Sequence, residues 1–512
     1  MSQTEIPTLS PKSNQKSGSS IRKNKDDKNK QVKILLVTPE ICDSIQLAST
    51  NGKSPCIKAG GLADISGLLM DSLTAVGAEV HVALPNFRSM MGAEAGGHSH
   101  LLHLCEDREF CYRQAVYDGD SDSNLRAALA FQRDVIQYII PKFKPDLVHC
   151  NDWMTGLVPA AARAMGIPSV FTLHNLHDER TTLAHIEDRG IDSASFWDQL
   201  YYARYPANYE ETRNHNRVSF LASGIHAASR VNTVSVGFLH ELANGQHMTS
   251  PQVIDALHGK VSAGHAVGIL NSLPDNRSPQ KDTALTSCYD AASHVEGKAA
   301  NKATLQRILG LEENSGAPLF FWPSRLDPMQ KGCQLLAEIL QQLVAEHGQS
   351  GIQFVFIADG AFYPHFENII AMHGLHRRVA LRKFHDPLSR HAYAASDFIL
   401  MPSSFEPCGL AQMIAMRYGS LPVVHATGGL RDTVSPMDAG ADQGNGFPFD
   451  FHDAAGLRWA IGQALEFHAL PADVRARQIA RVMSAAETAY RPAAMIDQYR
   501  QLYQDALGIP HS

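Results

Sequence analysis

The sequence lacks the features that identify several large protein classes. Its 512 residues contain no apolar run of about 18 residues, so a membrane-spanning helix is not expected. No apolar stretch typical of a secretory signal is visible near the first residue. Basic residues do not exceed acidic ones, and the net charge of −7 gives no support for binding nucleic acid or an acidic membrane.

Cysteine pairs and metal-binding patterns are missing too. The eight cysteines are scattered and form no C-x-x-C pair, which in a chain of this length is typical of reduced thiols in a cytoplasmic protein. Asp-rich metal loops, the phosphate-binding G-x-x-x-x-G-K-[ST] motif and the hydrolase G-x-S-x-G motif do not occur. The sequence therefore predicts no metal and no cofactor.

The sequence does contain a repeated alternation of apolar strands and helices. It begins at Val32 with "VKILLVTPE" and continues to about residue 490, interrupted by a loop-like segment over 272–299. Continuous apolar runs are typical of strands buried on both faces of a parallel sheet. We therefore predict an α/β fold of two Rossmann-like, doubly wound parallel sheets that face each other across a cleft. The predicted divisions are a disordered tail over 1–30, an N-terminal unit over 31–275, a C-terminal unit over 276–490 and a C-terminal helix or tail over 491–512.

Polar residues follow several predicted strands, where ligands bind in this architecture. In "KAGGL", Lys58 precedes Gly60 and Gly61, which favours either an anion site or a plain turn. Asp152 and His174 each end a strand of the N-terminal unit. A single histidine there is more often structural, but two polar strand ends favour a sugar pocket.

Two loops of the C-terminal unit carry further charged residues. "SRLDPMQKG" places Arg325 and Lys331 on one loop, where they either clamp a diphosphate without a metal or are simply solvated. "SSFEPCGLAQ" places Glu406 between a buried strand and a helix. Burying a carboxylate is costly unless a partner binds it, so Glu406 is a candidate ligand-binding group.

These segments together resemble bacterial glycogen synthases and plant starch synthases, glycosyltransferase family five of the GT-B fold. The resemblance extends from about residue 32 to 450 and is most specific in "FEPCGLAQMIAMRYGSLPVVHATGGLRDTV". It implies a hexosyltransferase that moves glucose from ADP-glucose to the non-reducing 4-hydroxyl of an α-1,4-glucan with retention of configuration. Its partners would be those two substrates, with no nucleic acid and no membrane.

The resemblance also implies roles for individual residues. Glu406 would accept hydrogen bonds from hydroxyls of the donor glucose, and Arg325 and Lys331 would neutralise the departing diphosphate. The turn over 427–430 would offer backbone amides to the phosphate. Asp152 would lie near the acceptor, and no second carboxylate of the retaining-hydrolase kind is expected. The implied catalytic set is Glu406, Arg325, Lys331 and His174. The implied substrate-binding set is Lys58, Gly60, Gly61, Asp152, Asn271, Cys408, Gly409, Leu410, Thr427, Gly428 and Gly429.

The chain departs from the family pattern at several loops. A segment between Glu40 and Lys58 looks inserted, and the residues that follow "FTLHNL" differ from the usual continuation through "SFWDQLYYARYPANYEETRNH". "NSLPDNRSPQ" replaces the usual hinge sequence. Two alternatives therefore stay open: a related retaining transferase that uses another donor, such as UDP-glucose, or another acceptor, and a catalytically impaired paralogue that binds glucan or nucleotide-sugar.

Overall fold

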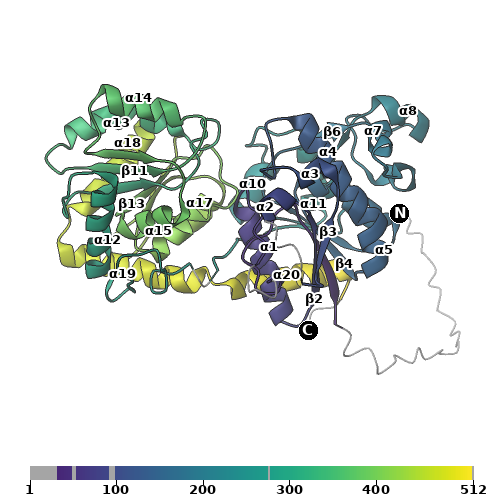
Figure 1. Cartoon of the computed structure of the whole chain (residues 1–512), viewed down its shortest axis with the longest axis horizontal. Coiled ribbons are helices and arrows are strands. Elements are labelled where there is room, and N and C mark those ends of the chain that lie inside the picture. The colour runs from purple at the N-terminus through teal and green to yellow at the C-terminus, as the bar shows by residue number, and fades with distance from the viewer. Residues whose placement is uncertain (1–30, 49–53, 92–98, 275–276, 510–512) are drawn as a thin grey trace, which may run out of the picture.

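The computed structural model describes residues 31–48, 54–91, 99–274 and 277–509, and it forms two α/β units (Figure 1). The predicted tail over 1–30 lies outside the described residues. Among the described residues, no helix has the length and apolar character that crossing a bilayer requires.

The N-terminal unit is built on a seven-stranded sheet in the order β3-β2-β1-β4-β5-β8-β9, and every neighbouring pair is parallel. A separate antiparallel pair joins β6 to β7. The strands are β1 (Lys33–Val37), β2 (Glu79–Pro85), β3 (Leu102–Cys105), β4 (Leu147–Asn151), β5 (Ser169–Leu173), β6 (Arg180–Thr181), β7 (Val218–Ser219), β8 (Arg230–Thr233) and β9 (Ala266–Gly268). The α-helices are α1 (Gly61–Ala75), α2 (Arg88–Met91), α3 (Arg108–Cys111), α4 (Ser121–Asp134), α5 (Ile140–Phe143), α6 (Val158–Ala164), α7 (Leu183–Asp188), α8 (Tyr209–His215), α9 (Phe220–Ala227), α10 (Val236–Ala243) and α11 (Pro251–Ser262).

The C-terminal unit repeats the architecture with a six-stranded parallel sheet in the order β12-β11-β10-β13-β14-β15. Its strands are β10 (Leu319–Trp322), β11 (Gln353–Ile357), β12 (Val379–Arg382), β13 (Phe398–Met401), β14 (Leu421–His425) and β15 (Phe447–Phe449). Its helices are α12 (His294–Leu309), α13 (Cys333–Glu346), α14 (Tyr363–Met372), α15 (Asp386–Ala395), α16 (Ala411–Arg417), α17 (Gly428–Thr433), α18 (Ala454–His468) and α19 (Ala472–Ala489).

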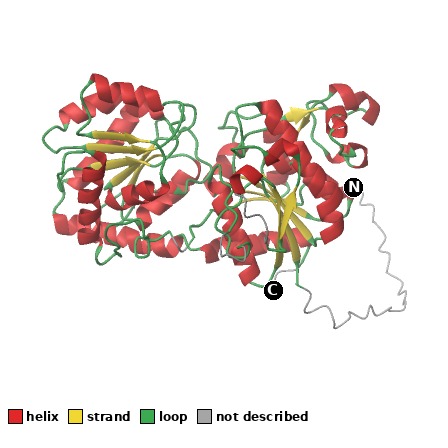
Figure 2. Ribbon diagram, in the orientation of Figure 1, coloured by secondary structure: helices red, strands yellow, loops and turns green. Residues whose placement is uncertain are grey.

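The apolar strand sequences account for both sheets. The central strands β4, β5, β10, β11 and β13 are buried at every residue, because helices cover both faces of each sheet (Figure 2). In each sheet the chain first builds one edge and then crosses to the other side of its first strand. This is the doubly wound arrangement that places ligands at the carboxyl ends of the strands, and it confirms the predicted fold class.

The last helix, α20 (Pro492–Leu507), returns from the C-terminal unit to the N-terminal unit (Figure 1). Its apolar face, including Met495, Tyr499 and Tyr503, belongs to the core around the first sheet. The Tyr503 hydroxyl also hydrogen-bonds His149 Nδ1 on β4 at 2.8 Å. The chain therefore connects the two units twice.

The segment over 272–299 is only partly a loop, which corrects the prediction. Helix α12 starts at His294, inside that segment. In a sequence-based prediction, Gly297 disfavours a helix here. In the structure, a Cβ at this position would lie only 2.4 Å from Cβ of Tyr289. Close packing of Tyr289 on the helix therefore accounts for the glycine, a reason that single-sequence reasoning does not reveal.

The prediction that all eight cysteines are reduced thiols is wrong for one pair. Cys42 and Cys56 form a disulfide, and the other six are free. The segment that looked inserted folds back on itself, since Ile41 and Ile57 exchange both backbone hydrogen bonds in an antiparallel bridge. That bridge brings the Cα atoms of the neighbouring cysteines to 4.0 Å of each other.

Candidate functional site

Glu406 and Lys331 form a buried ion pair at the carboxyl ends of two adjacent strands, β13 and β10. Lys331 Nζ lies 2.6 Å from Glu406 Oε2, and the Ser403 hydroxyl donates to the same oxygen at 3.0 Å. Both charged side chains are about one-tenth exposed. The expectation that Glu406 needs a bound ligand to offset its burial is therefore corrected, because an internal cation offsets much of the cost of burying this carboxylate.

The loop that carries Lys331 packs directly on the strand end before Glu406. Gly332 adopts a φ of +70°, and a Cβ there would lie 2.0 Å from the carbonyl oxygen of Pro402. Arg325 begins the same loop and is exposed. Within the described residues its guanidinium has no hydrogen bond or ion pair, so its charge is available to an anion at this edge of the sheet.

The Thr427–Gly429 turn lies against the backbone that follows Glu406. A Cβ on Gly428 would lie 2.1 Å from the Glu406 carbonyl oxygen, and one on Gly429 would lie 2.1 Å from that of Cys408. The Gly429 N–H donates to the Glu406 carbonyl at 3.0 Å. Two glycines are required because these two loops touch through their main chains.

Glu241 of α10 joins this turn from the N-terminal unit. Its carboxylate accepts the Gly428 N–H at 2.7 Å, and the Thr427 hydroxyl lies 3.1 Å and 3.2 Å from its two oxygens. Burial alone would raise the pKa of Glu241, but hydrogen bonds from His247 and the Gly428 N–H hold it below its usual range. An anionic side chain thus occupies the backbone amide that was expected to face a phosphate.

A second contact between the units joins the two loops that the sequence singled out. A Cβ on Gly61, at the start of α1, would lie 3.1 Å from the side chain of Leu410, just before α16. Leu410 packs against the cores of both units. The "KAGGL" and "EPCGL" loops therefore meet.

Acidic residues gather at the strand ends of the N-terminal unit. Burial raises the pKa of Asp152 to about 7, an effect that hydrogen bonds from the His174 and Asn175 amides reduce. Burial also raises the pKa of Glu40, although the Ala59 and Gly60 amides donate to its carboxylate at 2.6 Å and 2.9 Å. This unit can therefore hold or release a proton near neutral pH.

Asp152 also has an unusual backbone. Its φ of 56° and ψ of −178° lie in a region that is almost exclusive to glycine. Its side chain accepts hydrogen bonds from two backbone amides and from Asn175 Nδ2, which fix the carboxylate in this conformation. Such strain is concentrated at functional sites, so it supports a role for Asp152 beyond packing.

His174 is next to Asp152 and is uncharged at neutral pH. Its Nε2 lies 2.9 Å from Asn151 Oδ1, and burial lowers its pKa to about 3. Because the Asn151 oxygen can only accept, Nε2 carries the proton, and Nδ1, which has no partner in the described part of the chain, is left as an acceptor. His174 can therefore accept one hydrogen bond from a hydroxyl.

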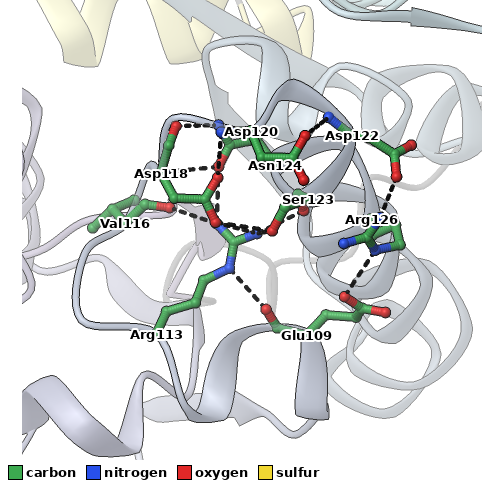
Figure 3. A network of polar contacts seen from close by, with 9 residues as sticks. All are labelled: Glu109, Arg113, Val116, Asp118, Asp120, Asp122, Ser123, Asn124 and Arg126. Atoms are coloured by element: carbon green, nitrogen blue, oxygen red, sulfur yellow. Dashed lines mark hydrogen bonds and ion pairs between the residues drawn. The ribbon is translucent and has the colours of Figure 1, made fainter.

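Tyr117 is a member of this cluster that the sequence analysis missed. Its hydroxyl hydrogen-bonds Glu40 and lowers the pKa of that carboxyl. The loop that carries it is held by Arg113, whose guanidinium hydrogen-bonds the Val116 carbonyl, Asn124 Oδ1 and Ser123 at the start of α4 (Figure 3). No local motif marks Tyr117, because its role depends on this tertiary network.

The remaining candidates from the sequence differ in their surroundings. Lys58 is exposed and pairs with Asp64, in the first turn of α1, at 2.7 Å. Asn271 is buried, and its Oδ1 has no hydrogen-bond partner among the described residues. Cys408 contacts Asn271, and burial raises the pKa of its thiol to about 12, which excludes it as a thiolate nucleophile at neutral pH. Gly409, with a φ of +73°, turns the chain between Cys408 and Leu410.

Metal ligands gather at one point of the described chain, where Cys42, Asp43 and Cys56 lie close together. The two sulfur atoms are joined to each other there. The structure thus assembles Lys331, Glu406 and the Thr427–Gly429 turn in the C-terminal unit, and Glu40, Asp152 and His174 in the N-terminal unit. Glu241 and Tyr117 are the additions that the sequence did not signal.

Known families match both units. Residues 33–252 match the family described as the starch synthase catalytic domain, and residues 317–466 match the glycosyl transferases group 1. A glycogen synthase of Moorella thermoacetica is 32% identical, and the match covers 94% of this chain and 98% of that protein. A glycogen synthase of Syntrophotalea carbinolica is also 32% identical, covering 91% and 99% of the two chains.

Solved structures match the whole arrangement. The catalytic domain of starch synthase IV from Arabidopsis thaliana, bound to ADP and acarbose, matches with a TM-score of 0.76 and 26% identity. That match covers 94% of this chain and all of the other. Sucrose-phosphate synthase from Thermosynechococcus elongatus, with a TM-score of 0.59 and 18% identity, shares the fold alone.

Proposed function

The chain belongs to the family of glycogen and starch synthases and is a glycosyltransferase, and from this premise we propose that it transfers glucose from ADP-glucose to the non-reducing 4-hydroxyl of an α-1,4-glucan with retention of configuration. The observation that carries the proposal is the Lys331–Glu406 pair at the carboxyl edge of the second sheet, whose lysine lies on the loop that begins with Arg325, a residue with no side-chain partner among the described residues. This arrangement supplies positive charge for a leaving diphosphate and a carboxylate for sugar hydroxyls.

In the proposed reaction, the bond between the anomeric carbon and the diphosphate breaks as the glucan hydroxyl attacks from the same face. Arg325 and Lys331 stabilise the negative charge that develops on the leaving group, as a metal does in other transferases. Glu406 holds the donor glucose through its hydroxyls. The leaving phosphate takes the proton of the incoming hydroxyl, so a second carboxylate is not needed.

The N-terminal cluster is proposed to bind the acceptor side. Asp152 and Glu40 offer hydrogen-bond acceptors to glucan hydroxyls, and neutral His174 offers Nδ1. Asn271, whose side-chain oxygen is buried and unpartnered, is proposed to contact the donor where it approaches the Cys408–Gly409 loop. Lys58 and the Gly60–Gly61 turn approach the donor from the opposite unit.

The adenine base is the part of the proposal that rests on similarity. The starch synthase IV structure contains ADP, and it matches 94% of this chain. The cytoplasmic location expected from the sequence also stays a prediction, which cell fractionation tests.

Donor choice is tested by incubating the purified protein with glycogen and labelled ADP-glucose or UDP-glucose. We expect more incorporation from ADP-glucose, and proton NMR of the product should show new α-1,4 linkages. Greater incorporation from UDP-glucose would replace the donor assignment. No incorporation from either donor would indicate a glucan-binding or nucleotide-sugar-binding paralogue.

The role of Glu406 is tested with Glu406→Ala in the same assay. Losing a contact that stabilises the reacting sugar should reduce the rate by about 10²-fold or more. Glu312→Ala, which removes a partly exposed carboxylate of the same unit, should behave as wild type. Unchanged incorporation by Glu406→Ala would exclude the proposed role.

A further inference from the structure

A large groove lies in the N-terminal unit and contains none of the residues assigned above. It has a volume of about 970 Å³ and is formed by residues 197–207 together with the start of α11 and His226 of α9. Residues 197–207 lie in the segment where the sequence departs from its family. Figure 1 shows α11, whose start lines the groove, in the N-terminal unit.

Four aromatic residues line this groove, and Tyr202 among them is itself largely buried. Trp197, Tyr201, Tyr202 and Tyr205 line it within nine consecutive positions, and Tyr205 is 97% exposed. Aromatic rings combine an apolar face with few rotatable bonds, so they bind flat apolar surfaces at a low cost in entropy. The C–H faces of pyranose rings are surfaces of this kind.

Polar groups that suit hydroxyls surround the aromatic rings. Asp198, Arg204 and Asp255 line the groove, and Gln252 Oε1 is buried without a hydrogen-bond partner among the described residues. An unpartnered buried acceptor is costly and is satisfied when a ligand donates to it. Because the groove has two carboxylates and one guanidinium, it disfavours the binding of a polyanion. The same groups suit a neutral ligand that is rich in hydroxyl groups.

Hydrogen bonds also fix the residues that line the groove. The Tyr201 amide donates to Ser223 Oγ at 2.9 Å, and the Tyr201 hydroxyl donates to Asp255. Asn216 forms two side-chain hydrogen bonds with the backbone of Arg204, at 3.1 Å and 2.7 Å. A preorganised surface avoids the entropy cost of ordering loops on binding.

We propose that this groove binds a segment of α-1,4-glucan and tethers the polymeric acceptor to the enzyme at a distance from the reacting chain end. The inference rests on the proposed function for its choice of ligand. A tether raises the effective concentration of chain ends at the transfer site, and this benefit applies only to acceptors long enough to reach both places.

The test compares Tyr205→Ala with wild type on a long and a short acceptor. Tyr205 is exposed, so its removal leaves the core intact. We expect the KM for glycogen to rise by about tenfold, with kcat and the KM for maltotriose unchanged. Tyr112→Ala removes another exposed tyrosine of the same unit, 79% exposed, and should match wild type.

A binding assay without a nucleotide sugar separates this inference from the proposed function. β-Cyclodextrin is a closed ring of α-1,4-linked glucose and has no chain end to extend. We expect isothermal titration calorimetry to detect its binding to wild type and to Tyr112→Ala, and at least about tenfold weaker binding to Tyr205→Ala and Gln252→Leu.

The outcomes of the two assays are distinguishable. Binding that depends on Tyr205 in a protein that fails to transfer glucose would support the groove and contradict the proposed function. Glucose transfer with equal glycogen KM values and equal cyclodextrin binding in wild type and Tyr205→Ala would overturn the groove assignment and leave the transferase intact. Tighter binding of an anionic polymer than of glucan in the same groove would also overturn it.

Discussion

Burial controls the charge of the histidines beneath the N-terminal site. His149 is fully buried on β4, and burial, followed by the proximity of a second titratable ring, His174, lowers its pKa to about 3. The Thr172 hydroxyl donates to Asn232, so it accepts from His149 Nε2–H, and His149 Nδ1 accepts from Tyr503. Every polar atom of the ring is therefore satisfied in the neutral form.

Because His149 is neutral in the folded chain, we expect the protein to lose stability in mild acid. Below pH 6.5, His149 binds a proton in the unfolded chain but stays neutral in the folded chain. Its contribution to stability is therefore complete above pH 6.5 and falls as the pH drops toward 3. At pH 5.5 the loss is about 1.4 kcal/mol. We expect His149→Gln to reduce the difference in unfolding free energy between pH 7.5 and 5.5 by about that amount, as measured by urea denaturation.

Asp152 changes the pH dependence of stability in the opposite direction. Its folded-state pKa of about 7 lies above the unfolded value, so its contribution to stability falls as the pH rises from about 4 to 7. The comparison of His149→Gln with wild type cancels this contribution. His373→Gln, a change at an exposed position, should keep the wild-type pH dependence. An identical pH dependence in His149→Gln and wild type would contradict the account.

At the scale of elements, α20 stabilises the unit that it returns to. Tyr499 is fully buried, its ring is tilted against that of His149, and its hydroxyl accepts from Asn232 Nδ2 at 3.1 Å. We expect Tyr499→Ala to lower the unfolding free energy of the N-terminal unit by about 3–5 kcal/mol, because it leaves a large cavity. Urea denaturation followed by circular dichroism measures this loss.

The neighbouring exposed residue provides the control. Gln498→Ala removes a side chain from the solvent face of the same helix and should change stability by less than about 0.5 kcal/mol. Equal stabilities of Tyr499→Ala and wild type would show that α20 does not belong to the N-terminal core.

The Cys42–Cys56 disulfide makes a second prediction at this scale. Its closed loop spans 14 positions, and a loop of this size contributes about 3 kcal/mol to stability when the cross-link restricts the unfolded chain. We expect dithiothreitol to lower the melting temperature of wild type but not of a Cys42→Ser/Cys56→Ser variant. Thiol titration of the denatured protein should detect six free thiols before reduction and eight afterwards.

Shifts of equal size in wild type and the double variant would contradict the disulfide, as would eight thiols before reduction. In a reducing compartment the pair would be a dithiol, so the same titration on protein trapped in the cell also bears on location.

The elements differ in how far the sequence predicts them. Apolar runs such as "KILLV" and "FILM" predict their strands, because burial on both faces leaves no room for polar residues. The same logic locates Glu406, Arg325 and Lys331 at strand ends. Tyr117, Glu241 and the disulfide could not be predicted, because each depends on a partner that only the folded chain brings close. The start of α12 was not predicted because Gly297 disfavours a helix, and only the packing of Tyr289 explains that glycine.

At the scale of the whole molecule, Glu241 couples the two units to the proposed phosphate site. Its carboxylate holds the amide of Gly428, a residue of the turn that the family resemblance assigns to a phosphate. Because Glu241 is anionic, it should oppose phosphate binding both by occupying the amide and by charge repulsion. We expect Glu241→Ala to bind ADP several-fold more tightly than wild type in isothermal titration calorimetry.

A matched control separates this effect from a general loosening of the units. Asp432 of α17 accepts the Gly237 N–H at 2.7 Å, so Asp432→Ala also removes a contact between the units but leaves the Gly428 amide occupied. It should bind ADP as wild type does. Equal or weaker ADP binding by Glu241→Ala would indicate that this carboxylate and the phosphate do not compete.

The positive charge at the edge of the second sheet is the central claim, and the turnover number of Arg325→Ala with ADP-glucose and maltotriose measures it most directly. Arg307→Ala, which removes an exposed guanidinium of the same unit, is the reference. The account predicts that kcat falls by about 10²–10³-fold in Arg325→Ala and stays at the wild-type value in Arg307→Ala. Equal kcat values for Arg325→Ala and wild type would contradict it.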